Sequence, residues 1–265
     1  MLIEFGMINK TIDAIIFDWA GTMIDHGCFG PVIAFQKTFT HFDIETSVAD
    51  CRAPMGLPKR DHIKAMIENP VINERIIKKT GREINETDLE AMYQYFLSIN
   101  EDIVLEHISL IEGVVDTVSW LRSKGIKVGS NSGYGRRLME RILPIVAEAG
   151  YRPDNLVCGD DLSEGRPSPL MMYRCFSDLG VYPPSKVIKV DDTAPGIMEG
   201  IAAGTLTIGV TLTGNHVGLT AYELEKLDDK ERDALHEDTA RHLRQAGAHY
   251  IIRHVSELPS LLVKM

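Results

Sequence analysis

The hydrophobic pattern divides the chain into stretches of two kinds. Short apolar runs that end in polar or glycine-containing segments are typical of buried strands in a parallel sheet. Such runs lie at 14–17, 125–129, 155–158, 186–190, 205–210 and 249–252. Helical patterns separate most of them, and strands that alternate with helices predict an α/β fold with a doubly wound, mostly parallel sheet.

The pattern between residues 26 and 106 is different, because it is helical and has hardly any strand signal. One predicted helix follows Ser47, which is a suitable cap, and another, with Lys59 near its beginning, follows the Pro- and Gly-rich break at 54–59. We therefore predict an α/β core formed by residues 1–25 and 107–265. Residues 26–106 would form an inserted α-helical cap domain.

The best amphipathic stretch of this insertion lies at 87–100, where Met92, Tyr93, Phe96 and Leu97 are spaced for one helix face. Such a stripe packs either in a core or against a second subunit. The second alternative makes a homodimer through the cap a plausible arrangement.

Composition narrows the possible partners and locations. The chain has 265 residues, of which 44% are hydrophobic and 25% charged, as in an ordinary globular protein. Its net charge of -10 argues against nucleic acid and anionic membranes, which need a basic face. The four cysteines have no paired spacing, and we find neither a signal peptide nor a membrane span in the sequence. We therefore expect a cytoplasmic protein.

Three of the predicted strands end in polar clusters, at 18–22, 130–134 and 191–193. The carboxyl ends of parallel strands meet at one edge of the sheet, where open α/β sheets bind their ligands. A single cluster of this kind is often only a helix cap. Three at corresponding places predict a functional site.

The side chains of these clusters have complementary chemistry. Asp18 and Asp192 offer the hard oxygen ligands that Mg²⁺ prefers. Ser132, with the N–H groups around Gly133, can cradle a phosphate. Arg166, in a Gly-Arg-Pro segment that opens a helix, adds a fork-shaped cation for phosphate oxygens.

These motifs resemble those of the haloacid dehalogenase superfamily of phosphotransferases. The resemblance implies a Rossmann-like core in which Asp18 attacks phosphorus. It also implies that Ser132 and Arg166 hold the phosphoryl group, and that Mg²⁺ is bound by Asp18, the Ala20 backbone carbonyl and Asp192.

Position 20 departs from the superfamily pattern in a way that limits the chemistry. Most phosphatases of the superfamily have there a second aspartate, which protonates the departing alcohol, whereas this chain has Ala20. Loss of a general acid lowers such a rate by roughly 10²–10⁴. Lys59 offers another route, because a lysine amine condenses with an aldehyde to an iminium. Cleavage of a P–C bond next to that iminium releases an enamine and needs no proton.

Trp19-Ala20 after the nucleophile, together with the segment from Met55-Gly56 to Lys59 and His62, resembles the phosphonoacetaldehyde hydrolases of the superfamily. The resemblance runs over nearly the whole chain. It implies that the cap brings Lys59 to the core, where it forms a Schiff base with the substrate. The resemblance also assigns further residues to the substrate pocket: Cys28, Met55, His62, Gly133 and Tyr134.

Lys59 must be neutral to attack a carbonyl. This requirement predicts a pKa well below the ~10.4 of a free lysine.

The fourth motif departs from the superfamily pattern as well. Many members have Gly-Asp and a further Asp four residues later, whereas this chain has Asp191-Asp192 and then Gly196. Asp191 either supplies the missing charge or contacts only a water beyond the metal ligands.

Two alternative functions stay open at this point. One is another phosphatase or phosphotransferase on the same core, acting on a phosphate ester. The other is a catalytically silent protein that binds a phosphate ligand.

Overall fold

The computed structural model describes residues 12–265, so residues 1–11 of the predicted core segment 1–25 lie outside the described residues. Its centre is a sheet of six parallel strands in the order β3-β2-β1-β4-β5-β6. The strands are β1 (Ala14–Phe17), β2 (Lys127–Ser132), β3 (Val157–Cys158), β4 (Val187–Asp191), β5 (Leu206–Val210) and β6 (Tyr250–Ile252). This architecture confirms the predicted α/β class with a parallel, Rossmann-like sheet.

Alternation along β1 explains how helices cover both faces of the sheet. Ile15 and Phe17 pack with one set of helices, which comprises α6 (Val114–Ser123), α7 (Arg136–Glu148) and α12 (Leu258–Lys264). Ala14 and Ile16 point to the other face and pack with α8 (Leu170–Leu179). Because successive side chains of a strand point to opposite faces, an apolar run such as this one is buried on both sides.

The remaining core helices follow strands β4 and β5 in the chain. Helix α9 (Ala194–Ala202) lies between β4 and β5 in the chain, and α10 (Ala221–Lys226) and α11 (Asp229–Gln245) lie between β5 and β6. The order reverses between β1 and β4, where β1 has β2 on one side and β4 on the other. Ligands of doubly wound sheets bind at such a switch point.

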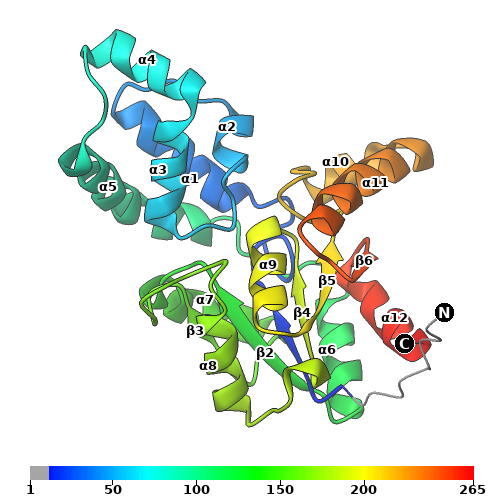
Figure 1. Cartoon of the computed structure of the whole chain (residues 1–265). Coiled ribbons are helices and arrows are strands. Elements are labelled where there is room, and N and C mark those ends of the chain that lie inside the picture. The colour runs from blue at the N-terminus through cyan, green and yellow to red at the C-terminus, as the bar shows by residue number, and fades with distance from the viewer. Residues whose placement is uncertain (1–11) are drawn as a thin grey trace, which may run out of the picture.

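Five helices between β1 and α6 form a separate group, which we call the helical body. They are α1 (Phe29–His41), α2 (Val48–Arg52), α3 (Lys59–Glu68), α4 (Pro70–Thr80) and α5 (Glu86–Leu105). The helical body has its own apolar cluster, in which Phe35, Phe39 and Phe96 are fully buried. Figure 1 shows it set apart from the sheet. The Ser47 side chain caps α2 as predicted, by accepting the N–H of Asp50.

The amphipathic face predicted on α5 packs mainly inside the helical body. Met92 and Phe96 are fully buried in its apolar cluster, so these two side chains follow the first of the two alternatives, packing in a core. Leu97 is 41% exposed. The homodimer stays a prediction without these two side chains.

None of the helices that the structure describes is both long enough and apolar enough to cross a membrane.

Candidate active site

Asp18 lies directly after β1 at the switch point of the sheet. Its backbone N–H donates to the carbonyl of Val190 on β4 at 3.0 Å, so the end of β1 is tied to its neighbour. Asp18 is 6% exposed, and its Oδ1 lies 2.7 Å from Nη2 of Arg166. This pair brings together two residues that lie far apart in the sequence and that the motifs predicted to meet.

Arg166 is surrounded by carboxylates. Besides Asp18, it pairs with Asp191 at 3.3 Å and with Glu199 at 3.3 Å, and it donates to Oδ1 of Asn131 at 2.8 Å. Burial lowers the pKa of the guanidinium, but Asp191 and the other carboxylates more than offset this effect, so the pKa rises. The arginine therefore stays charged and fixed beside the predicted nucleophile.

Lys189 and Glu199 extend this network beneath the site, and the sequence analysis missed both. Lys189 has no exposed surface and pairs with Asp191 at 3.0 Å and Glu199 at 3.5 Å. The Asn131 side-chain amide donates to both oxygens of Glu199 at 3.0 Å. A charged residue in the middle of an apolar strand is rarely buried without a partner, so the Lys in Val187-Ile188-Lys189-Val190 was the available signal.

The structure shows which groups Asp191, the additional carboxylate of the unusual fourth motif, contacts. Asp191 ends β4, is fully buried, and pairs with Arg166 and Lys189. Burial raises its pKa, but these two cations and hydrogen bonds from Thr193 more than offset the rise and hold the carboxylate ionised. A Cβ atom built on Gly196 would overlap the Asp191 carboxyl group. Asp191 therefore fills the space that a side chain at position 196 would need.

The carboxylates of the site are suited to a divalent cation. Oxygen atoms of Asp18, Asp191 and Asp192 all lie within 4.8 Å of one another. Burial, together with repulsion from Asp18 and Asp191, raises the pKa of Asp192 well above its usual range. Burial and the charge of Asp191 also raise the pKa of Asp18. A cation bound between Asp18 and Asp192 would relieve this repulsion, and carboxylate oxygens are the ligands that Mg²⁺ prefers.

Ser132 and Gly133 form the turn that follows β2. The strand continues to Ser132, three residues beyond its predicted end at 129, and Ser132 is only 2% exposed. Its Oγ accepts the backbone N–H of Tyr134 at 3.0 Å, which leaves the hydroxyl proton free to donate. Ser132 and Gly133 line the same small cavity as Asp18.

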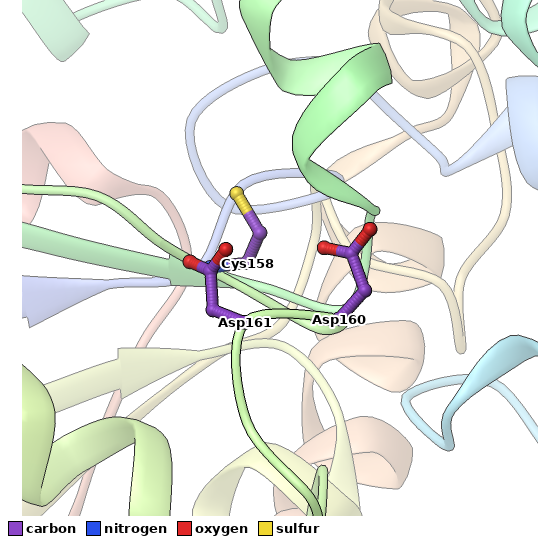
Figure 2. Close-up of side chains that lie close together, drawn as sticks. All are labelled: Cys158, Asp160 and Asp161. Atoms are coloured by element: carbon purple, nitrogen blue, oxygen red, sulfur yellow. The ribbon is translucent and has the colours of Figure 1, made fainter.

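A cluster at the end of β3 supports this turn. Figure 2 shows the side chains of Cys158, Asp160 and Asp161 close together. Asp160 accepts the first backbone N–H of α7 at 2.7 Å, and Asp161 accepts the N–H of Cys158 at 2.7 Å. Gly159, which follows Cys158, donates its N–H to the carbonyl of Tyr134 at 2.9 Å. These acidic side chains therefore bind backbone groups and fix the start of α7 next to Ser132.

Lys59 is the first residue of α3, and its amine reaches the core. It lines a small cavity of about 40 Å³ together with Asp18 and Ala20. The residue is half-buried, and Nζ lies 5.6 Å from the ring centre of Phe35 and 5.2 Å from that of Tyr134. Burial in these aromatic surroundings lowers the pKa of Lys59 to about 8. About one tenth of the amine is therefore neutral at pH 7, far more than for a free lysine, and the predicted chemistry uses this neutral form.

The other residues predicted for the substrate pocket have different environments. Cys28, Met55 and Tyr134 line the small cavity with Lys59. His62 does not line it. The His62 ring stacks on Phe35 with ring centres 3.7 Å apart, and Nε2 lies 3.0 Å from the carbonyl of Cys51. Burial and the charge of Lys59 hold the pKa of His62 well below its usual range, so the ring is neutral.

A second cavity of about 320 Å³ adjoins the small one, and both are lined by Lys59, Tyr134 and Arg166. Its outer wall combines residues of the helical body, such as Tyr93, with residues of the core, such as Arg137. The site therefore lies between the two parts of the chain.

Comparisons with known proteins agree with this geometry. The family model for haloacid dehalogenase-like hydrolases matches residues 12–204. A phosphonoacetaldehyde hydrolase from Vibrio cholerae is 41% identical over 261 residues, which are 98% of this chain and 96% of the relative. One from Paraburkholderia xenovorans is 40% identical over 249 residues, which are 94% of this chain and 93% of the relative. This chain belongs to the phosphonoacetaldehyde hydrolase family.

Solved structures support the same assignment. A phosphonoacetaldehyde hydrolase-like protein from Oleispira antarctica has a TM-score of 0.94 and 38% identity, with 100% of this chain and 96% of that chain covered. A predicted phosphoglycolate phosphatase from Haemophilus somnus has a TM-score of 0.71 and 15% identity, with 97% and 100% covered. The second likeness shows only that the fold is shared more widely than the phosphonoacetaldehyde hydrolase family.

Proposed function

We propose that this chain hydrolyses the C–P bond of phosphonoacetaldehyde to acetaldehyde and phosphate, through a Schiff base on Lys59 and an aspartyl-phosphate on Asp18. One observation carries the proposal: a lysine amine with a lowered pKa and a buried carboxylate line one cavity of about 40 Å³, in which position 20 is an alanine. An ester phosphatase would need an acid at that position. A carbon leaving group activated by an iminium does not.

The first step is the condensation of Lys59 with the aldehyde. The neutral amine attacks the carbonyl carbon, and water leaves to give an iminium whose carbon is next to the P–CH₂ group. Burial of the amine beside the Phe35 and Tyr134 rings favours its neutral form. Burial and the nearby carboxylates hold the pKa of the Tyr134 hydroxyl well above its usual range, so it stays protonated.

The second step transfers the phosphoryl group to Asp18. A carboxylate oxygen attacks phosphorus while the electrons of the P–C bond move into the iminium and form an enamine. Arg166 orients Asp18 through its 2.7 Å contact, and its charge opposes the rise that burial causes in the pKa of this carboxyl. The Ser132 hydroxyl and the Gly133 N–H donate to the phosphoryl oxygens.

Two water molecules complete the turnover. Protonation of the enamine carbon gives the iminium of acetaldehyde, which one water hydrolyses to acetaldehyde and free Lys59. A second water hydrolyses the aspartyl-phosphate to phosphate and free Asp18. Since one water was released when the iminium formed, the net reaction consumes one.

The carboxylates described above fit Mg²⁺, with Asp18, the Ala20 carbonyl and Asp192 as its protein ligands. When bound, Mg²⁺ would neutralise charge on the phosphoryl oxygens. We also propose that the helical body, residues 26–106, acts as a cap on the core, since Lys59 comes from one part and Asp18 from the other. Cytoplasmic location and homodimerisation stay predictions from the sequence.

Borohydride trapping tests the proposal directly. The protein is reduced with borohydride in the presence of phosphonoacetaldehyde, and the adduct is located by peptide mass mapping. We expect one adduct, on Lys59, together with phosphate release in the unreduced sample. Lys64 is a matched control, because it lies on the same helix with its side chain 53% exposed. Lys64→Ala should trap and turn over as the wild type does, whereas Lys59→Ala should do neither.

The same samples separate the two alternative functions. Rapid hydrolysis of an aryl phosphate by Lys59→Ala would indicate an ester phosphatase. Thermal stabilisation by phosphate and Mg²⁺ without any turnover would indicate a silent binding protein. Undiminished release of phosphate from phosphonoacetaldehyde by Lys59→Ala would refute the Schiff-base mechanism.

A further inference from the structure

The loop between β5 and α10 contacts both the helical body, through Arg52, and the carboxylate of Asp192. We propose that Arg52 on α2 and Asn215 in this loop are positioning residues, which couple docking of the helical body to the orientation of Asp192. The inference deepens the proposed function and relies on it only in taking Asp192 as a ligand of the divalent cation. Neither residue belongs to the motifs that led to the site.

Asn215 holds Asp192 from the core side. Its backbone N–H donates to Oδ2 of Asp192 at 2.7 Å, and the residue is 8% exposed. The preceding Gly214 permits this approach, because a Cβ atom there would lie 2.6 Å from the Asp192 Cβ. The Thr22 hydroxyl donates to the other oxygen, Oδ1, at 3.3 Å. A carboxylate held at both oxygens cannot rotate freely, so its remaining lone pairs have a fixed direction.

Arg52 holds Asn215 from the side of the helical body. Its Nη1 donates to the Asn215 carbonyl and to Oδ1 of the Asn215 side chain, both at 3.2 Å. In return, Nδ2 of Asn215 donates to the Arg52 carbonyl at 3.1 Å. Three hydrogen bonds in two directions thus join one residue of α2 to one residue of the loop. They form only when α2 lies against the core.

The arginine also contacts two further segments of the chain. Nη1 donates to the Gly27 carbonyl at 2.6 Å, in the link from β1 to α1, and Nη2 donates to the Gly218 carbonyl at 3.4 Å. These acceptors are carbonyl oxygens, and no carboxylate among residues 12–265 forms an ion pair with Arg52 within 4.0 Å. A planar guanidinium satisfies several carbonyls at fixed angles, which a lysine amine does not. The contact is therefore specific for one docked arrangement.

The loop reaches the turn after Asp18 as well. The N–H of Gly27 donates to the carbonyl of Thr213 at 2.8 Å, and the Thr213 hydroxyl donates to the carbonyl of Gly21 at 2.6 Å. The loop between β5 and α10 therefore braces the turns that carry both predicted metal-binding carboxylates. Undocking of Arg52 would free the loop, and Asp192 would lose its fixed orientation.

Equilibrium metal binding without substrate tests this coupling. Metal-free Arg52→Met and Asn215→Ala are loaded with Mn²⁺ and titrated with Mg²⁺. The Mg²⁺ affinity is measured from the displacement of Mn²⁺, followed by electron paramagnetic resonance. Loss of a residue that orients a metal ligand weakens binding by about 10- to 100-fold, and we expect each variant to fall in this range. Arg75→Met is the matched control, because Arg75 contacts Glu45 and Asp50 within the helical body. Its affinity should equal that of the wild type.

Two further variants make the result decisive. Arg52→Met/Asn215→Ala should bind Mg²⁺ no more weakly than the weaker single variant, because both changes break one connection. Arg52→Lys keeps the positive charge but loses the planar guanidinium, so it should bind Mg²⁺ at least about threefold more weakly than the wild type. It decides the matter if Arg52→Met does not fold.

An Mg²⁺ affinity of Arg52→Met within about twofold of the control, or one of Arg52→Lys less than about threefold below the wild type, would overturn the coupling. Because no substrate is present, a failure of the wild type to cleave phosphonoacetaldehyde would refute the proposed function and leave this inference standing.

Discussion

Replacement of Gly196 by alanine should destabilise the core, and removal of the Asp191 side chain should reverse the effect. The added methyl group would overlap the buried carboxyl group of Asp191, which is itself held by Arg166 and Lys189. Because these ion pairs hold the Asp191 carboxyl group in place, moving it aside would cost free energy. The two positions should therefore be energetically coupled.

The structure gives the size of this coupling. Overpacking a buried site costs about 1–3 kcal/mol, so Gly196→Ala should lower the free energy of unfolding by that amount. In an Asp191→Gly background the overlap is gone, and alanine in helix α9 should then stabilise by about 0.5–1 kcal/mol relative to glycine. The coupling free energy is the difference, about 1.5–4 kcal/mol. Asp191→Gly alone breaks buried ion pairs and should cost about 3–5 kcal/mol.

Urea unfolding of the wild type, both single variants and the double variant measures the coupling. The sequence has two tryptophans, Trp19 and Trp120, and both lie in the α/β core. Tryptophan emission therefore follows unfolding of the core and does not depend on the helical body. Equal slopes of the unfolding free energy against urea concentration would show that the four proteins expose similar surface.

A coupling below about 0.5 kcal/mol would refute this reasoning, because independent sites add within that range. A functional measurement extends the test. Asp191→Gly/Gly196→Asp places the carboxylate on the other side of the same space and should recover at least about tenfold of the turnover lost in Asp191→Gly. No recovery would mean that the carboxylate must come from position 191.

Other predictions address the chemical steps. Since burial lowers the pKa of Lys59 to about 8, the initial rate of borohydride trapping should rise with pH up to about that value and then level off. Such a lysine titrates between about pH 6 and about pH 9, so a trapping rate that does not change with pH over this range would contradict the prediction. Asp18→Asn should release no phosphate yet still form the Lys59 adduct, as measured by phosphate assay and mass mapping. Ala20→Asp should raise the hydrolysis of an alkyl phosphate by about 10²–10⁴ without raising that of phosphonoacetaldehyde. Mg²⁺ at about 100 times its dissociation constant should stabilise the EDTA-treated protein by about 2.7 kcal/mol, and Asp192→Asn should abolish the gain in thermal unfolding experiments.

Local sequence pattern was sufficient for the sheet and for most of the candidate site. Apolar runs marked each of the six strands, because a strand buried on both faces must be apolar at consecutive positions. The polar residues after these runs marked Asp18, Ser132 and Asp192, because parallel strands bring their carboxyl ends to one edge. The end of β2 was misplaced, since nothing local indicates that the polar segment 130–132 is buried between two neighbours.

The remaining features depend on pairings between distant segments. Lys189 was an isolated charge in an apolar strand, and only the fold supplied Glu199 and Asp191 as its partners. The lowered pKa of Lys59 comes from burial of its amine between parts of the chain that are distant in sequence, beside Phe35 of the helical body and Tyr134 of the core.

Sequence by itself thus predicted which side chains would carry the proposed chemistry and determined at which ends of the strands they lie, because those signals are local. Tertiary structure decided the partner of each buried charge, the role of Asp191 opposite Gly196, and the connection from Arg52 through Asn215 to Asp192. The physical reason is that burial and electrostatics depend on everything within a few ångströms, whereas the sequence orders residues only along the chain.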